Sequence, residues 1–292
     1  MRLFHKKEEK NSKGIEMIRT LKRNLSGREF HELLGQTKSE AGIRSLVDSL
    51  EDDELRWSAA LALGKIRSKK VARALIELFT APRKGVDVYR SIAWILGEIG
   101  HEEAIPVLTE ALENLSKDVE IRRNAAQSLG KIGSVEAAES LVEALRDEGV
   151  RQNAAQALGK IKSAYLVEYL HAYLWNKDPG MRQGITWALR EIASEKSIEP
   201  LAKALEDEEE KVRDGATWAL KRIFSPKNED KMLEILTTRE EEEIRERAAK
   251  ILFRIGGPEV RRQLKELSPK LPPENGQEEI TTIEVDKELK GG

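Results

Sequence analysis

The amino-acid sequence predicts an all-α fold, a right-handed α-solenoid of about seven to eight two-helix repeats. One phrase recurs along the chain at spacings of 29 to 33 residues. Its apolar residues follow helical spacing, and a second helical apolar stretch separates each phrase from the next. The copies are LRWSAALALGKI (55–66), VYRSIAWILGEI (88–99), IRRNAAQSLGKI (121–132), VRQNAAQALGKI (150–161), MRQGITWALREI (181–192), VRDGATWALKRI (212–223) and IRERAAKILFRI (244–255).

Each repeat is expected to contain two helices. We call the phrase helix B, in which apolar residues such as Met181, Ile185, Leu189 and Ile192 recur at helical spacing. The stretch before it is helix A, as in AIPVLTEAL (104–112), AAESLVEAL (137–145) and SIEPLAKAL (197–205). A degenerate helix B, SGREFHELLGQT (26–37), precedes the first clear phrase. Because neither helix can bury its apolar stripe alone, the pairs should stack on one another.

The junctions between helices carry capping residues. A serine precedes helix A at one column and is expected to cap it: Ser39, Ser68, Ser134, Ser163, Ser194 and Ser225. An acidic residue marks the start of helix B: Asp52, Asp118, Asp147, Asp178, Glu209 and Glu241. It precedes an arginine by four residues, which is the spacing of an ion pair across one helical turn. Where that arginine is replaced by Tyr89, the acid is replaced by Gly85. We therefore predict that Asp147–Arg151 and Asp178–Arg182 act as pairs that staple the repeats together.

The repeat unit D-x-x-[VIL]-R-x-x-A-A-x-x-L-G-x-I resembles the short HEAT-like repeat of the phycobilisome-lyase type, over residues 14–267. The resemblance implies the fold, with helix B on the concave surface, but no single activity. Residues 258–267 are expected to form a final capping helix. Residues 1–13 are expected to be a flexible charged N-terminus, and residues 268–292, with their prolines and charges, a disordered tail.

The composition excludes several classes of protein. The 292 residues include no cysteine, which excludes disulfides and thiolate metal sites. Lys+Arg (50) and Asp+Glu (52) nearly cancel, so the chain has no overall charge bias toward nucleic acid or anionic membranes. No stretch approaches the ~18 apolar residues of a membrane span. A monomeric, cytoplasmic protein is expected, and the abundance of Lys, Glu and Arg without Cys is typical of thermophilic proteins.

One side of helix B lies opposite its apolar side. At about 100° per residue, Trp187 lies about 200° from both Ile185 and Leu189. The same column contains Glu, Gln and Lys in other repeats, so it is not a core column. We predict that this surface is a groove that binds an extended protein segment through Trp57, Arg90, Trp94, Arg123, Asn124, Gln127, Gln152, Asn153, Gln156, Gln183, Trp187 and Trp218. The alternative is that the tryptophans only fill gaps between neighbouring repeats.

The sequence offers little for chemistry, and no catalytic residue, metal site or cofactor is expected. The recurring Leu-Gly-Lys-Ile lacks the earlier glycine and the following Ser or Thr of a phosphate loop, and its glycine should instead allow close helix contact. HEAT-like hydroxylases hold two irons with several His–Glu pairs, whereas this chain has only His31–Glu32 and His101–Glu102.

We therefore expect a non-enzymatic scaffold or adaptor. Two alternatives stay open. One is a bilin-lyase-like accessory subunit that handles a chromophore or modifies a partner protein. The other is a weak nucleic-acid-binding solenoid, for which the candidate cations are Arg28, Lys65, Arg90, Arg123, Lys131 and Lys160.

Overall fold

The computed structural model describes residues 2–25, 27–37, 39–82, 84–161 and 163–224, and then residues 233–234, 249, 252–253, 261–262 and 264. The chain divides into two compact units, residues 1–223 and 224–292. The described part of the first unit consists of helices and their connections, without a strand. The predicted all-α fold is confirmed.

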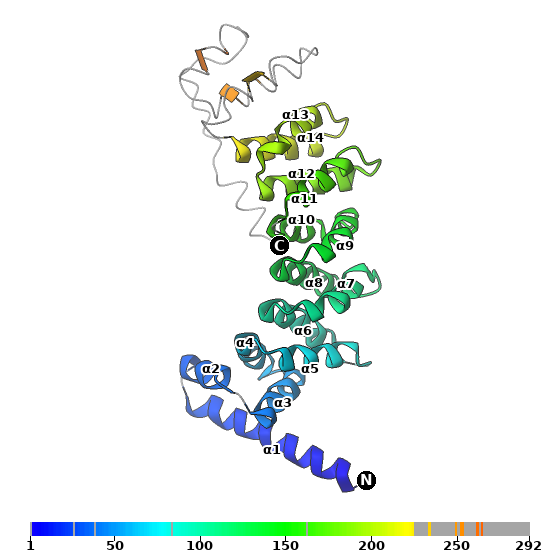
Figure 1. Cartoon of the computed structure of the whole chain (residues 1–292). Coiled ribbons are helices and arrows are strands. Elements are labelled where there is room, and N and C mark those ends of the chain that lie inside the picture. The colour runs from blue at the N-terminus through cyan, green and yellow to red at the C-terminus, as the bar shows by residue number, and fades with distance from the viewer. Residues whose placement is uncertain are drawn as a thin grey trace. The chain divides into compact units, whose positions relative to one another are not determined.

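Seven helix pairs follow one another in the described part of the first unit (Figure 1). The A helices are α1 (Arg2–Asn24), α3 (Glu40–Asp48), α5 (Lys69–Thr80), α7 (Ile105–Glu113), α9 (Ala138–Glu143), α11 (Ala164–Tyr173) and α13 (Ile198–Ala204). The B helices are α2 (Gly27–Gly35), α4 (Arg56–Ile66), α6 (Val86–Ile99), α8 (Val119–Ile132), α10 (Arg151–Lys160), α12 (Pro179–Ile192) and α14 (Glu210–Ile223). Short 3-10 turns extend some A helices: η1 (Ser49–Glu51), η2 (Glu102–Ala104), η3 (Val135–Ala137), η4 (Ala144–Arg146) and η5 (Glu195–Ser197).

The helices form two rows. Each B helix packs against the A helix of its own repeat and against the B helix of the next, from α2 through α14. The A helices α1, α3, α5, α7 and α9 also pack in succession. Each repeat therefore contacts mainly its neighbours, which is the arrangement of an α-solenoid.

The core lies between the two rows. One leucine column of helix B is completely buried, and it consists of Leu63, Leu96, Leu129, Leu158, Leu189 and Leu220. These leucines are the residues that the helical period placed on the apolar side of the phrase. Burial of each such side chain contributes about 1.5–3 kcal/mol to the stability of the fold.

Glycine allows neighbouring B helices to approach closely. A Cβ atom added to Gly130 would lie 2.6 Å from Cα of Ala157 on α10, and one added to Gly97 would lie 2.3 Å from Oγ of Ser128 on α8. At such separations a side chain cannot fit without moving the helices apart. The close contact expected at the Leu-Gly-Lys-Ile column is confirmed.

The caps agree with the sequence at most described positions. The hydroxyl groups of Ser39, Ser68 and Ser134 accept hydrogen bonds from backbone N–H groups in the first turn of α3, α5 and η3. Ser163 and Ser194 occupy the same position without a side-chain capping bond. Asp118 and Asp178 cap α8 and α12. Ser225 and Glu241 lie outside the described residues.

Most of the segment that was expected to be a flexible N-terminus belongs to a helix. Helix α1 begins at Arg2 and thus includes the segment 1–13 that was expected to be flexible, apart from Met1. This segment is rich in Lys and Glu, which are good helix formers, and has no proline, so it can continue a helix that Ile18 anchors in the core.

The second unit contains the last repeat phrase and the expected capping helix, and few of its residues are described. Those that are described are helical, and Ala249, Leu252 and Leu264 are buried. The predicted tail, 268–292, lies outside the described residues. Within the described part of the chain, no helix is both long enough and apolar enough to cross a membrane.

Candidate functional site

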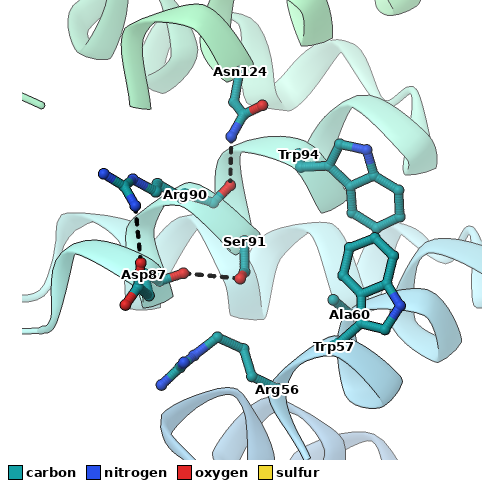
Figure 2. Close-up of a pocket in the computed structure, with 8 residues that line it drawn as sticks. All are labelled: Arg56, Trp57, Ala60, Asp87, Arg90, Ser91, Trp94 and Asn124. Carbon is teal, nitrogen blue, oxygen red and sulfur yellow. Dashed lines mark hydrogen bonds and ion pairs between the residues drawn. The ribbon is translucent and has the colours of Figure 1, made fainter. Parts of the chain in front are cut away.

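A pocket of about 420 Å³ opens on the surface formed by helices α4, α6 and α8 (Figure 2). Its lining residues come from three successive repeats: Arg56, Trp57 and Ala60 of α4, Asp87, Arg90, Ser91 and Trp94 of α6, and Asn124 of α8. Four of them, Trp57, Arg90, Trp94 and Asn124, belong to the predicted binding set. The other eight residues of that set do not line this pocket.

Two tryptophans form one wall of the pocket. The ring centroids of Trp57 and Trp94 are 5.6 Å apart, and their planes are inclined by 33°. Trp57 is 64% exposed and Trp94 is half-buried. Nζ of Lys131 lies 5.7 Å from the centroid of the Trp94 ring. Both indoles therefore face away from the core, as the sequence predicted, and they also contact each other between repeats.

The opposite side of the pocket is charged, as Figure 2 shows. Arg90 donates through Nε and Nη2 to the two carboxylate oxygens of Asp118, at 3.0 Å each, and through Nη1 to Asp87, also at 3.0 Å. The hydrogen bond from Arg90 is the main cause that lowers the pKa of the Asp118 carboxyl group. Because Asp118 caps α8, Arg90 ties α6 to the start of the next B helix.

The remaining polar side chains of the pocket are also held in place. Nε of Arg56 donates to the carbonyl oxygen of Leu50 at 2.9 Å, and its Nη2 donates to Asp53 at 2.5 Å. Nδ2 of Asn124 donates to the carbonyl oxygen of Arg90 at 3.3 Å. Asn124, predicted to bond to a ligand backbone, thus uses one amide N–H to join α8 to α6. These contacts fix the polar wall before any ligand arrives.

The other polar members of the predicted set lie further along the B helices. Arg123 donates through Nε to the carbonyl oxygen of Gly149 and through Nη1 to Glu120, at 2.6 Å each. Oε1 of Gln183 accepts a hydrogen bond of 3.4 Å from Arg151. Among the described amide side chains of the set, those that make no such hydrogen bond are Gln127, Asn153 and Gln156, which are partly buried, and Gln152, which is exposed.

The two later tryptophans differ from each other in burial. Trp187 is half-buried, and its Cδ1 atom lies 3.6 Å from where a Cβ of Gly215 would be, so this indole packs toward α14. Trp218 is exposed. For Trp187, packing between repeats explains the position at least as well as ligand binding does.

The Asp–Arg pairs join neighbouring repeats rather than residues one turn apart. Arg122 pairs with Asp147, and Arg182 pairs with Asp207 through two bonds of 2.8 Å. Arg151 instead donates through Nε to the carbonyl oxygen of Leu145 at 2.7 Å. The predicted partners Asp147–Arg151 and Asp178–Arg182 were wrong, whereas the predicted stapling of repeats was right.

The physical reason lies in the caps. Asp178 turns its Oδ1 atom toward the backbone N–H of Met181, 2.9 Å away, and Asp147 does the same toward Gly149, 2.8 Å away. A carboxylate held against its own helix N-terminus does not reach the side chain four residues later. The second carboxylate oxygen of each of these aspartates faces the preceding repeat.

Tyr89 stands where the other repeats have the arginine that follows the acidic residue of helix B by four positions. It makes a similar contact. Its hydroxyl group donates to the carbonyl oxygen of Ala81 at 2.6 Å. In other repeats the arginine of this column donates to a loop carbonyl, as Arg56 does to Leu50 and Arg213 does to Asp207 at 2.7 Å. The phenol therefore keeps the hydrogen bond to the loop without the charge.

A tyrosine stripe on α11 was not among the features predicted from the sequence. Tyr165, Tyr169 and Tyr173 are spaced four residues apart, and the hydroxyl oxygens of Tyr169 and Tyr173 are 3.1 Å apart. Burial is the main cause that raises the pKa of Tyr169. Nearby, Nζ of Lys203 lies 4.8 Å from the ring centroid of Trp175. The spacing in AYLVEYLHAY was the available signal, on the A row and away from the predicted groove.

The histidines give no sign of a metal site in the described residues. His101 stands at the start of η2 without a side-chain capping bond. Nε2 of His171 lies 2.9 Å from Oγ of Ser197, and burial lowers the pKa of this imidazole. The described residues contain no group of three or more His, Asp or Glu that could hold a metal ion. The side chain of His31 lies outside the described residues.

The repeat geometry agrees with comparisons to protein families. The family model for HEAT repeats matches residues 84–149, 146–221 and 198–274, and the model for the PBS lyase HEAT-like repeat matches residues 55–80. The HEAT matches together cover more than half of the chain. The chain therefore belongs to the HEAT-repeat proteins.

Several solved structures are similar to this chain. A structure of Kap121p is 13% identical, with a TM-score of 0.52 over 84% of this chain and 32% of that one, and this likeness shows the fold. The complex of CpcE and CpcF of phycocyanin lyase from Nostoc sp. PCC7120 is 22% identical, with a TM-score of 0.41 over 81% and 97%. Human deoxyhypusine hydroxylase is 19% identical, with a TM-score of 0.36 over 85% and 92%. A comparison with curated proteins gives no match.

Proposed function

We propose that this chain is a non-enzymatic scaffold or adaptor that binds an extended segment of a partner protein along its B helices. The Trp57–Trp94 pocket is the anchor of this surface. The observation that supports the proposal is a pair of indole rings, that of Trp57 exposed and that of Trp94 half-buried, beside a fixed row of hydrogen-bonding groups. Tryptophan is enriched among the residues that dominate binding energy at protein interfaces, because it offers a large contact area at a small cost in side-chain entropy.

The dimensions of the surface suit an extended chain. Neighbouring helices pack about 8–10 Å apart, and an extended chain advances about 3.3 Å per residue. Each repeat would then meet about three residues of the ligand. A pocket of about 420 Å³ that spans α4, α6 and α8 has room for part of such a segment, because ligand pockets range over about 300–1,000 Å³.

The charge arrangement disfavours nucleic acid as the ligand. Three of the candidate cations are engaged by carboxylates: Arg90 by Asp118, Arg123 by Glu120 and Lys131 by Glu98. Affinity for nucleic acid comes largely from Lys and Arg that neutralise phosphates and release counterions. Cations that already have protein partners contribute less to this effect.

The test begins with peptide ligands of the full chain. A displayed library of short random peptides is selected on the purified protein, and synthetic versions are titrated by fluorescence anisotropy. Trp57→Ala and Trp94→Ala should each weaken the selected peptides by about tenfold or more. Trp175→Ala, which removes an exposed indole from a different surface, should leave the affinity unchanged. If no selected peptide depends on Trp57 or Trp94 while circular dichroism shows intact folding, the proposal is wrong.

A bilin-lyase-like role is the second candidate. The match of the PBS lyase HEAT-like repeat model at residues 55–80, a segment that includes Trp57, supports it. A planar tetrapyrrole could stack on the two indoles. Titration with biliverdin tests this candidate: a saturable absorption shift that Trp57→Ala abolishes would favour chromophore handling over binding of a protein segment.

A further inference from the structure

We propose that the Trp57–Trp94 pocket holds a lysine or arginine side chain of the bound segment, with the cation on the indole rings and facing Asp87. This inference rests on the proposed function and specifies the chemistry of one ligand position. It comes from the balance of charges around the pocket and from the exposed aromatic wall.

Arg90 is flanked by two other arginines, one on α4 and one on α8. Arg56 pairs with Asp53 at 2.5 Å, and Arg123 on α8 pairs with Glu120 at 2.6 Å. Each of these two guanidinium groups therefore has its own carboxylate. Neither leaves an uncompensated positive charge beside the pocket.

Arg90 itself contacts two carboxylates. Asp118 takes two of its N–H groups, and Asp87 takes a third through a single oxygen. This cluster thus has one net negative charge, because it combines three arginines with four carboxylates. The arginines are Arg56, Arg90 and Arg123, and the carboxylates are Asp53, Asp87, Asp118 and Glu120. The carboxylate in excess is Asp87, which lines the pocket and whose side chain remains 64% exposed. A bound cation would restore the balance.

The aromatic wall of the pocket suits a cation. Tryptophan is the best of the aromatic residues for contact with a cation, because its ring face carries the most negative potential. The chain already uses such contacts, since Lys131 lies 5.7 Å from the Trp94 ring centroid and Lys203 lies 4.8 Å from that of Trp175. Lys131 is paired with Glu98 and approaches Trp94 alone. The more exposed ring, that of Trp57, remains available to a cation from a ligand.

Other side chains fit this pocket less well. A carboxylate would approach a cluster that already has an excess negative charge. A purely apolar side chain would cover the indoles but would also remove water from Asp87 without replacing its hydrogen bonds. A long cationic side chain covers the indoles and also satisfies Asp87, because its methylene stem packs on the rings and its charged end reaches the carboxylate.

The test uses small probes and the indole N–H signals. The chain has five tryptophans, which give five indole signals in a 15N–1H correlation spectrum. The probes are N-acetyl-lysine N-methylamide, the matching arginine compound, and N-acetyl-norleucine N-methylamide, which is apolar. We expect the two cationic probes to shift the signals of Trp57 and Trp94 saturably, and the norleucine probe to shift them much less. Trp57→Phe and Trp94→Phe assign the two signals.

Two matched variants test the role of the carboxylate. Asp87→Asn should weaken the cationic probes by about threefold to fivefold, because an exposed ion pair is lost while the side-chain size is kept. Asp214→Asn removes an equal charge from the exposed surface of α14 and should leave the affinity at Trp57 and Trp94 unchanged. Thermal melts of both variants show whether the fold is retained.

The outcomes separate this inference from the proposed function. Equal shifts by the norleucine and lysine probes, or an unchanged lysine affinity in Asp87→Asn, overturn the cation assignment. Selected peptides that need Trp57 but tolerate norleucine in place of every Lys and Arg also overturn it, and they leave the proposed function standing. If the lysine probe binds but no peptide depends on Trp57, the pocket chemistry is right and the proposed function is wrong.

Discussion

Arg182 on α12 is joined to Asp207, in the connection before α14, by two hydrogen bonds of 2.8 Å, and the two side chains are only 7% and 6% exposed. The same guanidinium group donates to the carbonyl oxygen of Asn176 at 2.8 Å. The hydrogen bond to Asp207 is the main cause that raises the pKa of Arg182. The Arg182 side chain thus fixes both the connection before α12 and the connection before α14.

Arg182→Ala should lower the free energy of unfolding by about 3–5 kcal/mol, because it leaves the buried Asp207 carboxylate without its partner. Urea unfolding measures the change. Arg146→Ala is the control, since its pair with Asp178 is longer, at 3.4 Å, and more exposed. The control should lose less than about 1 kcal/mol. Similar losses in the two variants would mean that burial does not set the strength of these ties.

Gly130→Ala should destabilise the chain by about 1–3 kcal/mol, because its Cβ would lie 2.6 Å from Cα of Ala157 and would force α8 and α10 apart. The gain in helix propensity from alanine, about 1 kcal/mol, does not offset this clash. Gly85→Ala is the control, since a Cβ there meets nothing within 4 Å. The control should change stability by no more than about 0.5 kcal/mol in thermal or urea unfolding. A stabilised Gly130→Ala variant would contradict the packing argument.

Tyr89→Phe should cost about 1 kcal/mol, because it deletes the hydrogen bond to the Ala81 carbonyl and keeps the aromatic ring. The edge contact of that ring with Phe79, at 5.6 Å between centroids, should survive. Tyr165→Phe, at an exposed position on α11, should be neutral within about 0.5 kcal/mol. Comparison of the two denaturation midpoints decides the matter, and equal midpoints would remove the role assigned to the Tyr89 hydroxyl group.

Glu103 should give the fold an acid-sensitive tie between α5 and η2. Hydrogen bonds from Arg73, and then from Lys69, lower the pKa of this carboxyl group from 4.5 to about 2. Because the folded pKa is the lower one, the stabilisation is complete above the ordinary pKa and is lost as the pH falls from 4.5 toward about 2. A 13C titration of the Glu103 carboxyl carbon should show the low midpoint, and Arg73→Gln should move it upward. A midpoint near the ordinary value in the unaltered chain would contradict this.

The sequence predicted the helices well because helical periodicity is a local property. The phrase around Leu189, with its apolar residues three and four positions apart, needs no knowledge of distant residues. The direction of the tryptophans followed from the same rotation about the helix axis. The contact of Trp57 with Trp94 did not follow, because these residues stand in different columns of neighbouring repeats and meet only through the offset between α4 and α6.

The electrostatic partners could not be read from the spacing alone. A separation of four residues suggested Asp178–Arg182, but Arg182 pairs with Asp207, 25 residues later in the chain. Likewise Arg90 and Arg123 were assigned to ligand binding because they point outward, and the structure shows them engaged with Asp118 and Glu120. An outward direction does not tell whether a neighbouring repeat has already satisfied the charge.

The arginine ties between the described repeats have a polarity along the chain, whereas lysine ties such as Lys131–Glu98 run in the opposite direction. The guanidinium group always comes from the earlier repeat and the carboxylate from the later one, as in Arg122–Asp147 and Arg182–Asp207. A fragment that stops after α12 would lose Asp207 but keep the hydrogen bond from Arg182 to the Asn176 carbonyl, and a fragment that starts at α13 would lose Arg182 but keep the hydrogen bond from the Glu209 N–H to Asp207. During synthesis from the N-terminus, the arginine of such a tie would therefore emerge before the carboxylate that neutralises it in the next repeat. A cut between α12 and α13 should therefore remove the tie from both fragments, while each fragment keeps its own local hydrogen bond.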